Sequence, residues 1–355
     1  MSIERVIANL KGVVVKKNVD LSQISFSRTG GMVKYYFLPL SESSAINLFA
    51  AFYNKSEDYK VIGKTSNIIF LDVVEYSYFI DLKNLSSFNF TGNNSIYIQS
   101  GREVSDICRD VAAKCLSGLE GLEGVPGTLG GAITMNAGAY GYKISDHIVS
   151  VRVYSKESNQ VQTLSSDKCL FDHRRSLFSS GKYIILGANF SLLSSSIKKI
   201  QVSMSLYHIA RHTYQDYTLP NLGSIFYFHE KNIYELIYEN TSGYKRAVFY
   251  FLKRLWTSRL TRHVRRAYPD NKILNYFILN YLKFKIDTRL ISDKTLNTFV
   301  NPGVTTLEIC KHIQSLKFYL AGSIKLENEI FVGQIYSIID VKAYMKILNI
   351  KEDVE

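Results

Sequence analysis

The residues from 118 to 146 offer the clearest sign of chemistry in the chain. This stretch, GLEGLEGVPGTLGGAITMNAGAYGYKISD, holds eight glycines and only four charged residues. A glycine inside a regular element costs roughly 0.5–1 kcal/mol relative to alanine, so stability does not explain so many. A flexible loop is one interpretation, although the interleaved apolar side chains are untypical of disordered linkers. The pattern favours a backbone that a ligand approaches closely and whose N–H groups bind phosphate.

A second candidate phosphate loop is GKTSN, residues 63–67, between two expected strands. Taken alone, the segment is typical of a turn, and it lacks the spacing of a P-loop. It also offers backbone amides and hydroxyl groups in a tight loop, which suits a diphosphate.

Three further stretches carry side chains that could bind or react. FDHRRSLF (171–178) has adjacent arginines, which either pair with a protein carboxylate or hold a substrate carboxylate. Ser224 in NLGSIF (221–226) is either a turn or cap residue or a serine aimed at a substrate. In IKLENEIF (324–331) the alternation predicts one strand with Glu327 and Glu329 on the same face. These two acids are either solvated or, if buried, candidates for a general acid.

The elements that position these stretches alternate between strands and helices, which predicts a mixed α/β fold. Strands are expected at 32–40, 59–63, 67–72, 77–82, 95–101, 147–157, 159–165 and 182–193. Helices are expected at 41–54, 104–116 and 198–212. A boundary is expected near residue 216, and the remainder is rich in aromatic residues and in helical patterns such as 232–239 and 305–320.

Composition and charge narrow the class of protein. The chain has 355 residues and a net charge of +12, of which nine Lys or Arg against one acid lie between Lys245 and Lys272. No apolar run reaches the length of a membrane span, and the N-terminal residues lack a signal-type apolar segment. The four cysteines have no metal-type spacing and are interpreted as reduced thiols. These features predict a cytoplasmic protein without a metal site.

Taken in order, these stretches resemble the UDP-N-acetylenolpyruvoylglucosamine reductase family. Residues 118–141 match its flavin loop closely, and VIGKTSNIIFLD is similar to its G-x-G-S-N strand–loop–strand. FDHRRSLF resembles F-x-Y-R-x-S-x-F, NLGSIF resembles G-S-x-F, ISDKTLNTFVNPGVTT follows S-x-K-H-x-N-F-x-x-N-x-G-x-A-T, and IKLENEI resembles L-E-x-E-V. The similarity runs over most of the chain.

The resemblance implies an α+β fold. An FAD-binding fold of the vanillyl-alcohol-oxidase type would have two α/β subdomains, at 1–83 and 84–215. A separate α+β substrate domain would follow at 216–355, with a basic helical insertion at about 243–290. FAD would be bound without a covalent link, because residues 118–142 contain no His or Cys. The implied cofactor-binding residues are Gly63, Lys64, Thr65, Ser66, Asn67, Pro126, Gly127, Thr128, Gly130, Gly131, Ala132, Asn136 and Gly138.

The resemblance also implies a reaction. NADPH reduces FAD, and the hydride then reaches the vinyl carbon of UDP-N-acetylglucosamine enolpyruvate, giving UDP-N-acetylmuramate for peptidoglycan synthesis. Arg174 would stabilise negative charge on the substrate carboxylate, with Glu329 beside it, and Ser224 would donate the proton to the adjacent carbon. The implied partner is this small UDP-sugar rather than nucleic acid, and the implied state is a monomer.

Several positions depart from the family pattern, mostly in the substrate domain. His173 replaces a tyrosine and Thr65 a glycine, while Tyr227 and Phe228 stand where a lysine and an asparagine are expected. The family's His and Phe in the late motif are Thr295 and Thr298, and its G-G-A is DTR at 287–289. Two alternatives therefore stay open. One is a diverged paralogue that reduces another nucleotide-linked sugar, and the other is a flavin-binding protein with an interaction role.

The basic segment 245–272 allows three interpretations. Its apolar residues roughly follow helical spacing, which suits a solvated helix packed on the substrate domain. A basic helix with large apolar residues also suits peripheral contact with an anionic membrane. The third interpretation is a lid that brings positive charge to an anionic UDP-sugar.

Overall fold

The computed structural model describes residues 10–228, 232–257, 271–320 and 325–331. The chain divides into two compact units. Unit 1 holds the residues up to Val19 together with Val33–Thr65 and Tyr76–Ile209. Unit 2 holds Asp20–Met32, Ser66–Glu75 and the residues from Ala210 onward. The subdomain boundaries expected from the sequence, at residues 83 and 215, stay a prediction.

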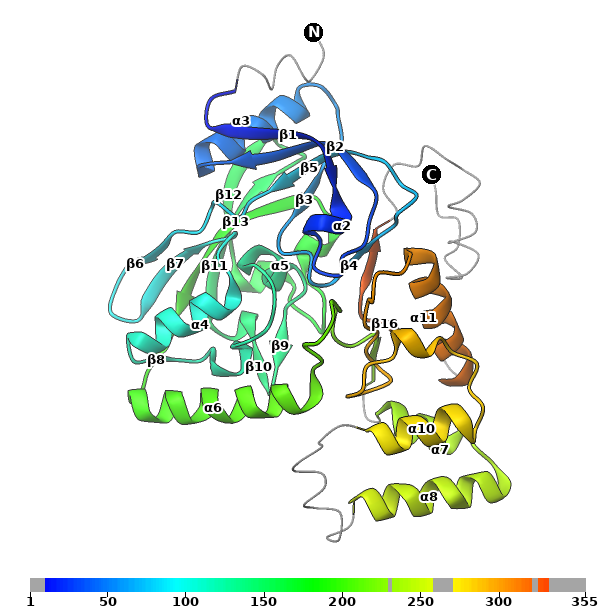
Figure 1. Ribbon diagram of the computed structural model, residues 1–355. Coiled ribbons are helices and arrows are strands. Elements are labelled where there is room, and N and C mark those ends of the chain that lie inside the picture. Colours follow the sequence, from blue (N-terminus) through cyan, green and yellow to red (C-terminus); the bar gives the residue numbers. More distant parts are fainter. Residues whose placement is uncertain (1–9, 229–231, 258–270, 321–324, 332–355) are drawn as a thin grey trace. The chain divides into compact units, whose positions relative to one another are not determined.

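A four-stranded sheet begins unit 1, in the order β1-β2-β5-β3. Its strands are β1 (Val13–Asp20), β2 (Met32–Pro39), β5 (Tyr76–Asp81) and β3 (Lys60–Ile62), and β5 runs parallel to both β2 and β3. Helix α3 (Glu42–Tyr53) begins at a capping box between Ser41 and Ser44, as the sequence predicts. Helix α3 lies close to β1 and β2 (Figure 1). Its buried Phe49 and Phe52 pack with Phe37 of β2 in one apolar cluster.

A five-stranded antiparallel sheet completes the framework of unit 1. Its order is β12-β11-β13-β7-β6, with β12 at Gln160–Ser165, β11 at Ile148–Ser155, β13 at Tyr183–Ser191, β7 at Ser95–Gln99 and β6 at Phe88–Phe90. Helices α4 (Val104–Ala113) and α5 (Leu129–Thr134) also belong to unit 1, whereas α6 (Ile197–Tyr214) begins in unit 1 and ends in unit 2. Two short strand pairs complete unit 1, β8–β14 (Leu116–Ser117, Leu193–Ser194) and β9–β10 (Gly138–Ala139, Tyr142–Lys143). The strands and helices expected in this region are thereby confirmed.

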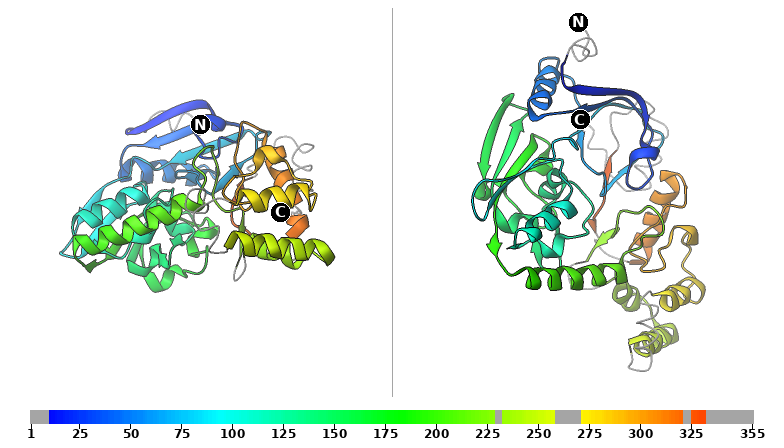
Figure 2. Two further views of the ribbon diagram at one scale, coloured as in Figure 1. Left: turned by 60° about the horizontal axis from the view of Figure 1, so that its bottom comes forward. Right: turned by 60° about the vertical axis from the view of Figure 1, so that its left-hand side comes forward.

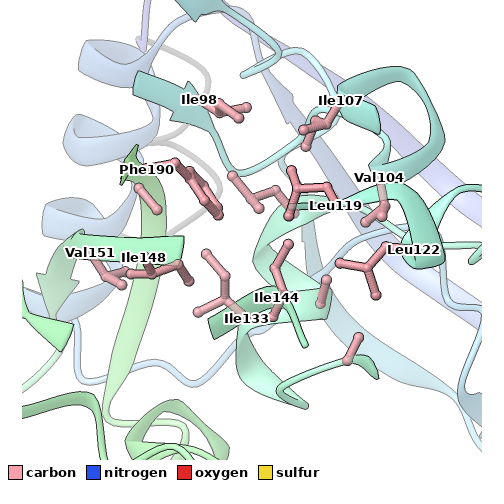
Figure 3. Packing of buried hydrophobic residues seen from close by; sticks show 14 of the residues in the cluster. Ile98, Val104, Ile107, Leu119, Leu122, Ile133, Ile144, Ile148, Val151 and Phe190 are labelled. Atoms are coloured by element: carbon pink, nitrogen blue, oxygen red, sulfur yellow. The ribbon is translucent and has the colours of Figure 1, made fainter. Parts of the chain in front are cut away.

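The glycine-rich stretch is part of the core of unit 1 rather than a flexible loop. Its Leu119, Leu122 and Ile133 point into the cluster that holds Ile98 and Phe190 of the sheet (Figure 3). All five side chains are at most 1% exposed. The apolar residues between the glycines therefore anchor this segment, and the interpretation as a disordered loop is wrong.

Unit 2 is mainly helical. It contains α2 (Leu21–Ile24), α7 (Ile233–Glu239), α8 (Gly243–Thr257), α10 (Lys272–Asn280) and α11 (Thr306–Leu320). Helices α8 and α10 lie side by side (Figures 1 and 2). The ring centroids of Phe249 and Phe277 are 5.8 Å apart. No helix within the described ranges is long and apolar enough to cross a bilayer.

The stretch IKLENEIF forms two strands, so the prediction of one continuous strand is wrong. Strand β16 (Lys325–Leu326) pairs antiparallel with β15 (Phe226–Tyr227), whereas β17 (Glu329–Phe331) pairs parallel with β4 (Ile68–Phe70). The two strands have different partners that run in different directions. Strand pairing is therefore interrupted at Glu327 and Asn328, between β16 and β17.

Candidate functional site

The glycine-rich loop is fixed by backbone hydrogen bonds to the segment between β7 and α4. The N–H of Leu129 donates to the carbonyl of Arg102 at 2.9 Å, and the N–H of Gly130 donates to that of Ser100 at 2.8 Å. A Cβ on Gly130 would lie 3.2 Å from the Cβ of Ser100. Gly130 therefore serves close packing of the loop, since its N–H is already bonded within the protein.

Gly131 behaves differently from Gly130. It is exposed, and a Cβ on Gly131 would have Oγ1 of Thr128 as its nearest neighbour, at 3.8 Å. The first N–H groups of a helix lack partners within the helix, and Gly131 is the third residue of α5. Its backbone is thus accessible, as the approach of a phosphate group requires.

The two candidate phosphate loops meet within unit 1. A Cβ on Gly63 would lie only 2.2 Å from Oγ1 of Thr128. Thr65 is buried with a φ of +56°, the left-handed region that favours glycine. Lys64 is engaged by Glu103, with Nζ and Oε2 2.5 Å apart. Gly63 therefore packs directly against Thr128 of the glycine-rich loop.

The remaining predicted cofactor residues divide between the two units. Pro126 and Gly127 lead into α5, and Gly127 has a φ of +145°. Ala132 is buried and donates its N–H to the carbonyl of Thr128. Gly138 lies in β9, where a Cβ would lie 2.9 Å from the carbonyl oxygen of Tyr142. Ser66 and Asn67 belong to unit 2.

Asn136 gives an independent indication that the loop receives a ligand. The residue has a φ of +42°, and its Nδ2 donates to the carbonyl of Asp172 at 3.0 Å. Its buried Oδ1 has no hydrogen-bond partner among the described residues, and such an acceptor is costly to leave unmet. An accessible backbone at Gly131 and an unmet acceptor at Asn136 fit a dinucleotide such as FAD, which offers both phosphates and hydrogen-bond donors.

Arg174 lies in a tight turn that is attached to the same loop. Asp172 and Arg175 exchange backbone hydrogen bonds of 2.9 and 3.3 Å, and Arg174 between them has a φ of +51°. This left-handed conformation costs a non-glycine residue roughly 1–2 kcal/mol. The turn is anchored to the last residue of α5, because Oγ of Ser176 donates to the carbonyl of Thr134 at 2.7 Å. Ten other non-glycine residues of the described chain also have a positive φ. The attachment of the turn to α5, rather than the φ value, is therefore what places Arg174 at the candidate site.

Ser224 lies in unit 2 on a segment whose backbone is held on both sides. The serine is exposed, whereas Leu222 and Ile225 are buried. The N–H of Gly223 donates to Oδ1 of Asn221 at 3.1 Å, and that of Ile225 donates to the carbonyl of Asn297 at 2.7 Å. An exposed hydroxyl on a fixed backbone can be aimed at a substrate, as the functional interpretation of Ser224 requires.

Asn297 was not singled out by the sequence, although it lies in the late motif. Its Oδ1 accepts from the N–H of Phe226 at 2.9 Å, and its Nδ2 donates to the carbonyl of the same residue, also at 2.9 Å. A nearby buried carboxyl, Asp216, accepts a hydrogen bond from Ser292 at 2.8 Å. Burial raises the pKa of Asp216, but hydrogen bonds from Thr218 and Ser292 lower it, and the net pKa shift is downward.

The strand β17 brings Glu329 into the framework of unit 2. The backbone of Glu329 is in parallel register with Ile68, directly after the GKTSN loop. The structure describes the backbone of Glu329 and not its side chain. Glu327 is half-buried, and its N–H donates to the carbonyl of Ile225 at 2.9 Å. The structure thus brings the Ser224 segment, the β17 segment and Asn67 together in unit 2, and the Arg174 turn and the glycine-rich loop together in unit 1.

Comparison with known proteins agrees with this geometry. Residues 33–164 match the family described as FAD binding domain. The UDP-N-acetylenolpyruvoylglucosamine reductase of Petrotoga mobilis is 30% identical over 220 residues, which cover 61% of this chain and 72% of that protein. The corresponding protein of Shouchella clausii is 33% identical over 212 residues, covering 60% of this chain and 68% of that protein.

A solved structure extends the likeness to the fold. The UDP-N-acetylenolpyruvylglucosamine reductase (MurB) of Thermus caldophilus has a TM-score of 0.63 and 19% sequence identity, with 90% of this chain and 99% of that chain covered. This match supports the expected α+β architecture, an FAD-binding fold with a further domain. From the sequence relatives and the flavin-type loop, the chain belongs to the UDP-N-acetylenolpyruvoylglucosamine reductase family.

Proposed function

We propose that the protein is an FAD-dependent reductase that uses NADPH to convert UDP-N-acetylglucosamine enolpyruvate to UDP-N-acetylmuramate for peptidoglycan. The observation that carries this proposal is the attachment of the Arg174 turn to the end of α5, the helix of the flavin-type loop, through the hydrogen bond from Ser176 to Thr134. The protein acts as a monomer in the cytoplasm on this small-molecule substrate. The molar mass of the purified protein, measured by light scattering, tests the proposed monomeric state.

Each proposed site residue has one task. FAD, when bound, supplies the hydride that it has received from NADPH. The guanidinium of Arg174 binds the substrate carboxylate and stabilises the negative charge that develops there. The hydroxyl of Ser224 donates a proton to the neighbouring carbon, and Glu329 assists at the carboxylate. In the cofactor loops, the accessible backbone at Gly131 and the amide of Asn136 hold the dinucleotide.

The test separates the two half-reactions under anaerobic conditions. NADPH is expected to bleach the flavin absorbance, and the enolpyruvyl substrate is expected to restore it. Ser224→Ala should leave the bleaching rate unchanged and slow the restoration by about 10²–10⁴-fold, the usual contribution of a positioned acid. Ser158→Ala, an exposed serine in unit 1, is the matched control. Equal slowing of both half-reactions by Ser224→Ala would make that serine structural.

The two alternative functions give different outcomes in the same experiment. A paralogue for another nucleotide-linked sugar would be bleached by NADPH but not restored by the enolpyruvyl substrate. Tyr227 and Phe228, where the family pattern has a lysine and an asparagine, are the positions that favour this alternative. A flavin-binding protein with an interaction role would not be bleached at all.

Helix α8 supports a second proposal, peripheral contact with an anionic membrane. Phe249 is fully buried, yet Tyr244, Phe251 and Leu255 are 70%, 62% and 45% exposed. Helical geometry places these three on a common stripe away from Phe249. The helix also carries two lysines and two arginines without any acid, a net charge of +4. An exposed aromatic stripe with basic neighbours fits the interface of a membrane that contains anionic lipids.

Vesicle flotation tests this contact. The protein should float with anionic vesicles at low salt and be released as salt screens the interaction. Tyr244→Ser with Phe251→Ser should abolish flotation, whereas Leu206→Ser, an equally exposed leucine in α6, should not. Sedimentation of the wild-type protein at every salt concentration would refute the contact. In that case the lid interpretation predicts that deleting 246–266 raises the substrate KM and spares the NADPH step. Residues 258–270 of the basic segment lie outside the described residues.

A further inference from the structure

The turn between β16 and β17 contains a buried amide that no motif of the sequence singles out. Asn328 is 5% exposed. Its Nδ2 donates to Oδ1 of Asn67 at 3.1 Å and to the carbonyl of Leu222 at 3.4 Å. Asn67 in turn donates its Nδ2 to the carbonyl of Glu327 at 3.1 Å. The side chain of Asn67, expected to bind the cofactor, is therefore occupied with protein contacts in unit 2.

The orientation of both amides follows from their partners. A backbone carbonyl can only accept a hydrogen bond, so the atom that faces Leu222 must be the nitrogen of Asn328. For the same reason, the atom that faces Glu327 is the nitrogen of Asn67. The oxygen of Asn67 is then left to accept from Asn328, as the structure shows. The network has a single consistent arrangement of donors and acceptors.

This network is not what the stability of unit 2 alone would favour. The Oδ1 of Asn328 is buried and has no hydrogen-bond partner in the described part of the chain. An unmet buried acceptor lowers stability, whereas an apolar side chain of the same size avoids that loss. A role other than packing therefore accounts better for the amide at this position.

That role is indicated by the carbonyl that Asn328 holds. Leu222 lies two residues before Ser224, while Asn297 fixes the backbone directly after it. Asn328 thus holds the segment on its N-terminal side and connects it to β17, the strand of Glu329. The N–H side of the Leu222–Gly223 peptide is held by Oδ1 of Asn221 at 3.1 Å, whereas its carbonyl side is held by Asn328. Without the Asn328 bond, the peptide keeps its restraint on the N–H side and loses the one on the carbonyl side.

We propose that Asn328 is a positioning residue, whose amide holds the Leu222 carbonyl and thereby fixes the direction of the Ser224 hydroxyl. The inference rests on the proposed role of Ser224 as proton donor. Small displacements of a reacting group cost much rate, about 10²-fold for 1 Å. Loss of this one hydrogen bond should therefore affect proton donation far more than any other step.

The experiment compares Asn328→Ala with Asn240→Ala in the FAD-loaded full chain. Asn240 is a matched control, because its Nδ2 donates to a backbone carbonyl, that of Leu320, at 3.0 Å in the same unit. Asn328→Ala should slow reoxidation of the flavin by the enolpyruvyl substrate by about 10–10²-fold and leave reduction by NADPH unchanged. The solvent deuterium isotope effect on reoxidation should rise, because proton transfer becomes limiting. Asn240→Ala should change neither rate nor isotope effect.

Amide hydrogen exchange gives a readout that does not depend on activity. Exchange at 222–225 should become faster in Asn328→Ala and stay at the wild-type rate in Asn240→Ala. Unchanged exchange there, or equal slowing of both half-reactions, overturns the inference. If the alanine variant does not fold, Asn328→Ser carries the same comparison, since its hydroxyl is shorter and cannot reach both acceptors. If the wild-type flavin is never reoxidised by this substrate, the proposed function fails, while the exchange measurement still decides whether Asn328 holds the segment.

Discussion

A methyl group added at Gly63 should weaken FAD binding, and the structure identifies the atom responsible. The Cβ of Gly63→Ala would lie 2.2 Å from Oγ1 of Thr128 and 3.4 Å from the Cβ and Cγ2 of that threonine. Thr128 is buried and β-branched, so its χ1 angle is stiff and the hydroxyl cannot rotate away freely. The two cofactor loops must therefore separate.

The size of the effect follows from the cost of overpacking. Inserting a methyl group into a packed site costs about 1–3 kcal/mol. If the loops keep their bound geometry only by accepting this strain, the Kd for FAD rises by about 5- to 150-fold, at 1.4 kcal/mol per tenfold. Thr128→Ala removes the Oγ1 atom, and the closest remaining approach, 3.4 Å, is ordinary van der Waals contact.

A double-mutant cycle measures this coupling by fluorescence titration of apoprotein with FAD. We expect Gly63→Ala combined with Thr128→Ala to bind FAD more tightly than Gly63→Ala alone, with a coupling of about 0.5–3 kcal/mol. Gly92→Ala is the control, because its Cβ would lie 3.6 Å from Ser95, an ordinary contact. If Gly63→Ala binds FAD like the wild type, or if the second substitution gives no rescue, the two loops do not form one cofactor surface.

Three other predictions concern the flavin, Arg174 and His312. Acid precipitation should release all flavin into the supernatant, and flavin retained in the pellet would show a covalent link. Arg174→Lys should slow mainly the reoxidation step, because lysine cannot reproduce the planar guanidinium fork; an equal loss in NADPH reduction would contradict its role. Burial lowers the pKa of His312 to about 4, with Asp287 opposing, so the unfolded chain binds the proton more tightly. The contribution of neutral His312 to the free energy of unfolding should be fully present above about pH 6.5 and fall by up to about 3 kcal/mol towards pH 4. A His312→Leu variant whose denaturant unfolding has the same pH dependence as the wild type would refute this.

The sequence predicts those elements whose signals are local. Helix α3 was expected because Ser41 and the spacing of Leu48, Phe49 and Phe52 act over a single helix. Strand β1 gave no such signal, since most of its side chains are exposed and show no alternation.

The sequence-based predictions for the site fail at residues whose conformation depends on partners far away in the sequence. The break at Glu327 and Asn328 depends on β15 and β4, which are far away in the sequence. Asn297 and Asn328 look like ordinary turn residues in the sequence. Their function depends on backbone carbonyls that only the folded chain brings near.

The pairing of β4 with β17 also has a consequence for how the chain is made. Asn67 and Glu327, which flank this pair, are 260 residues apart. At 5–20 residues per second, a ribosome needs about 13–52 s to synthesise that interval. Throughout this time one edge of β4 presents unpaired N–H and C=O groups, which are a template for aggregation. Nascent chains that stop before residue 329 would never cover this edge, so C-terminal truncation should yield insoluble protein rather than a shorter active enzyme.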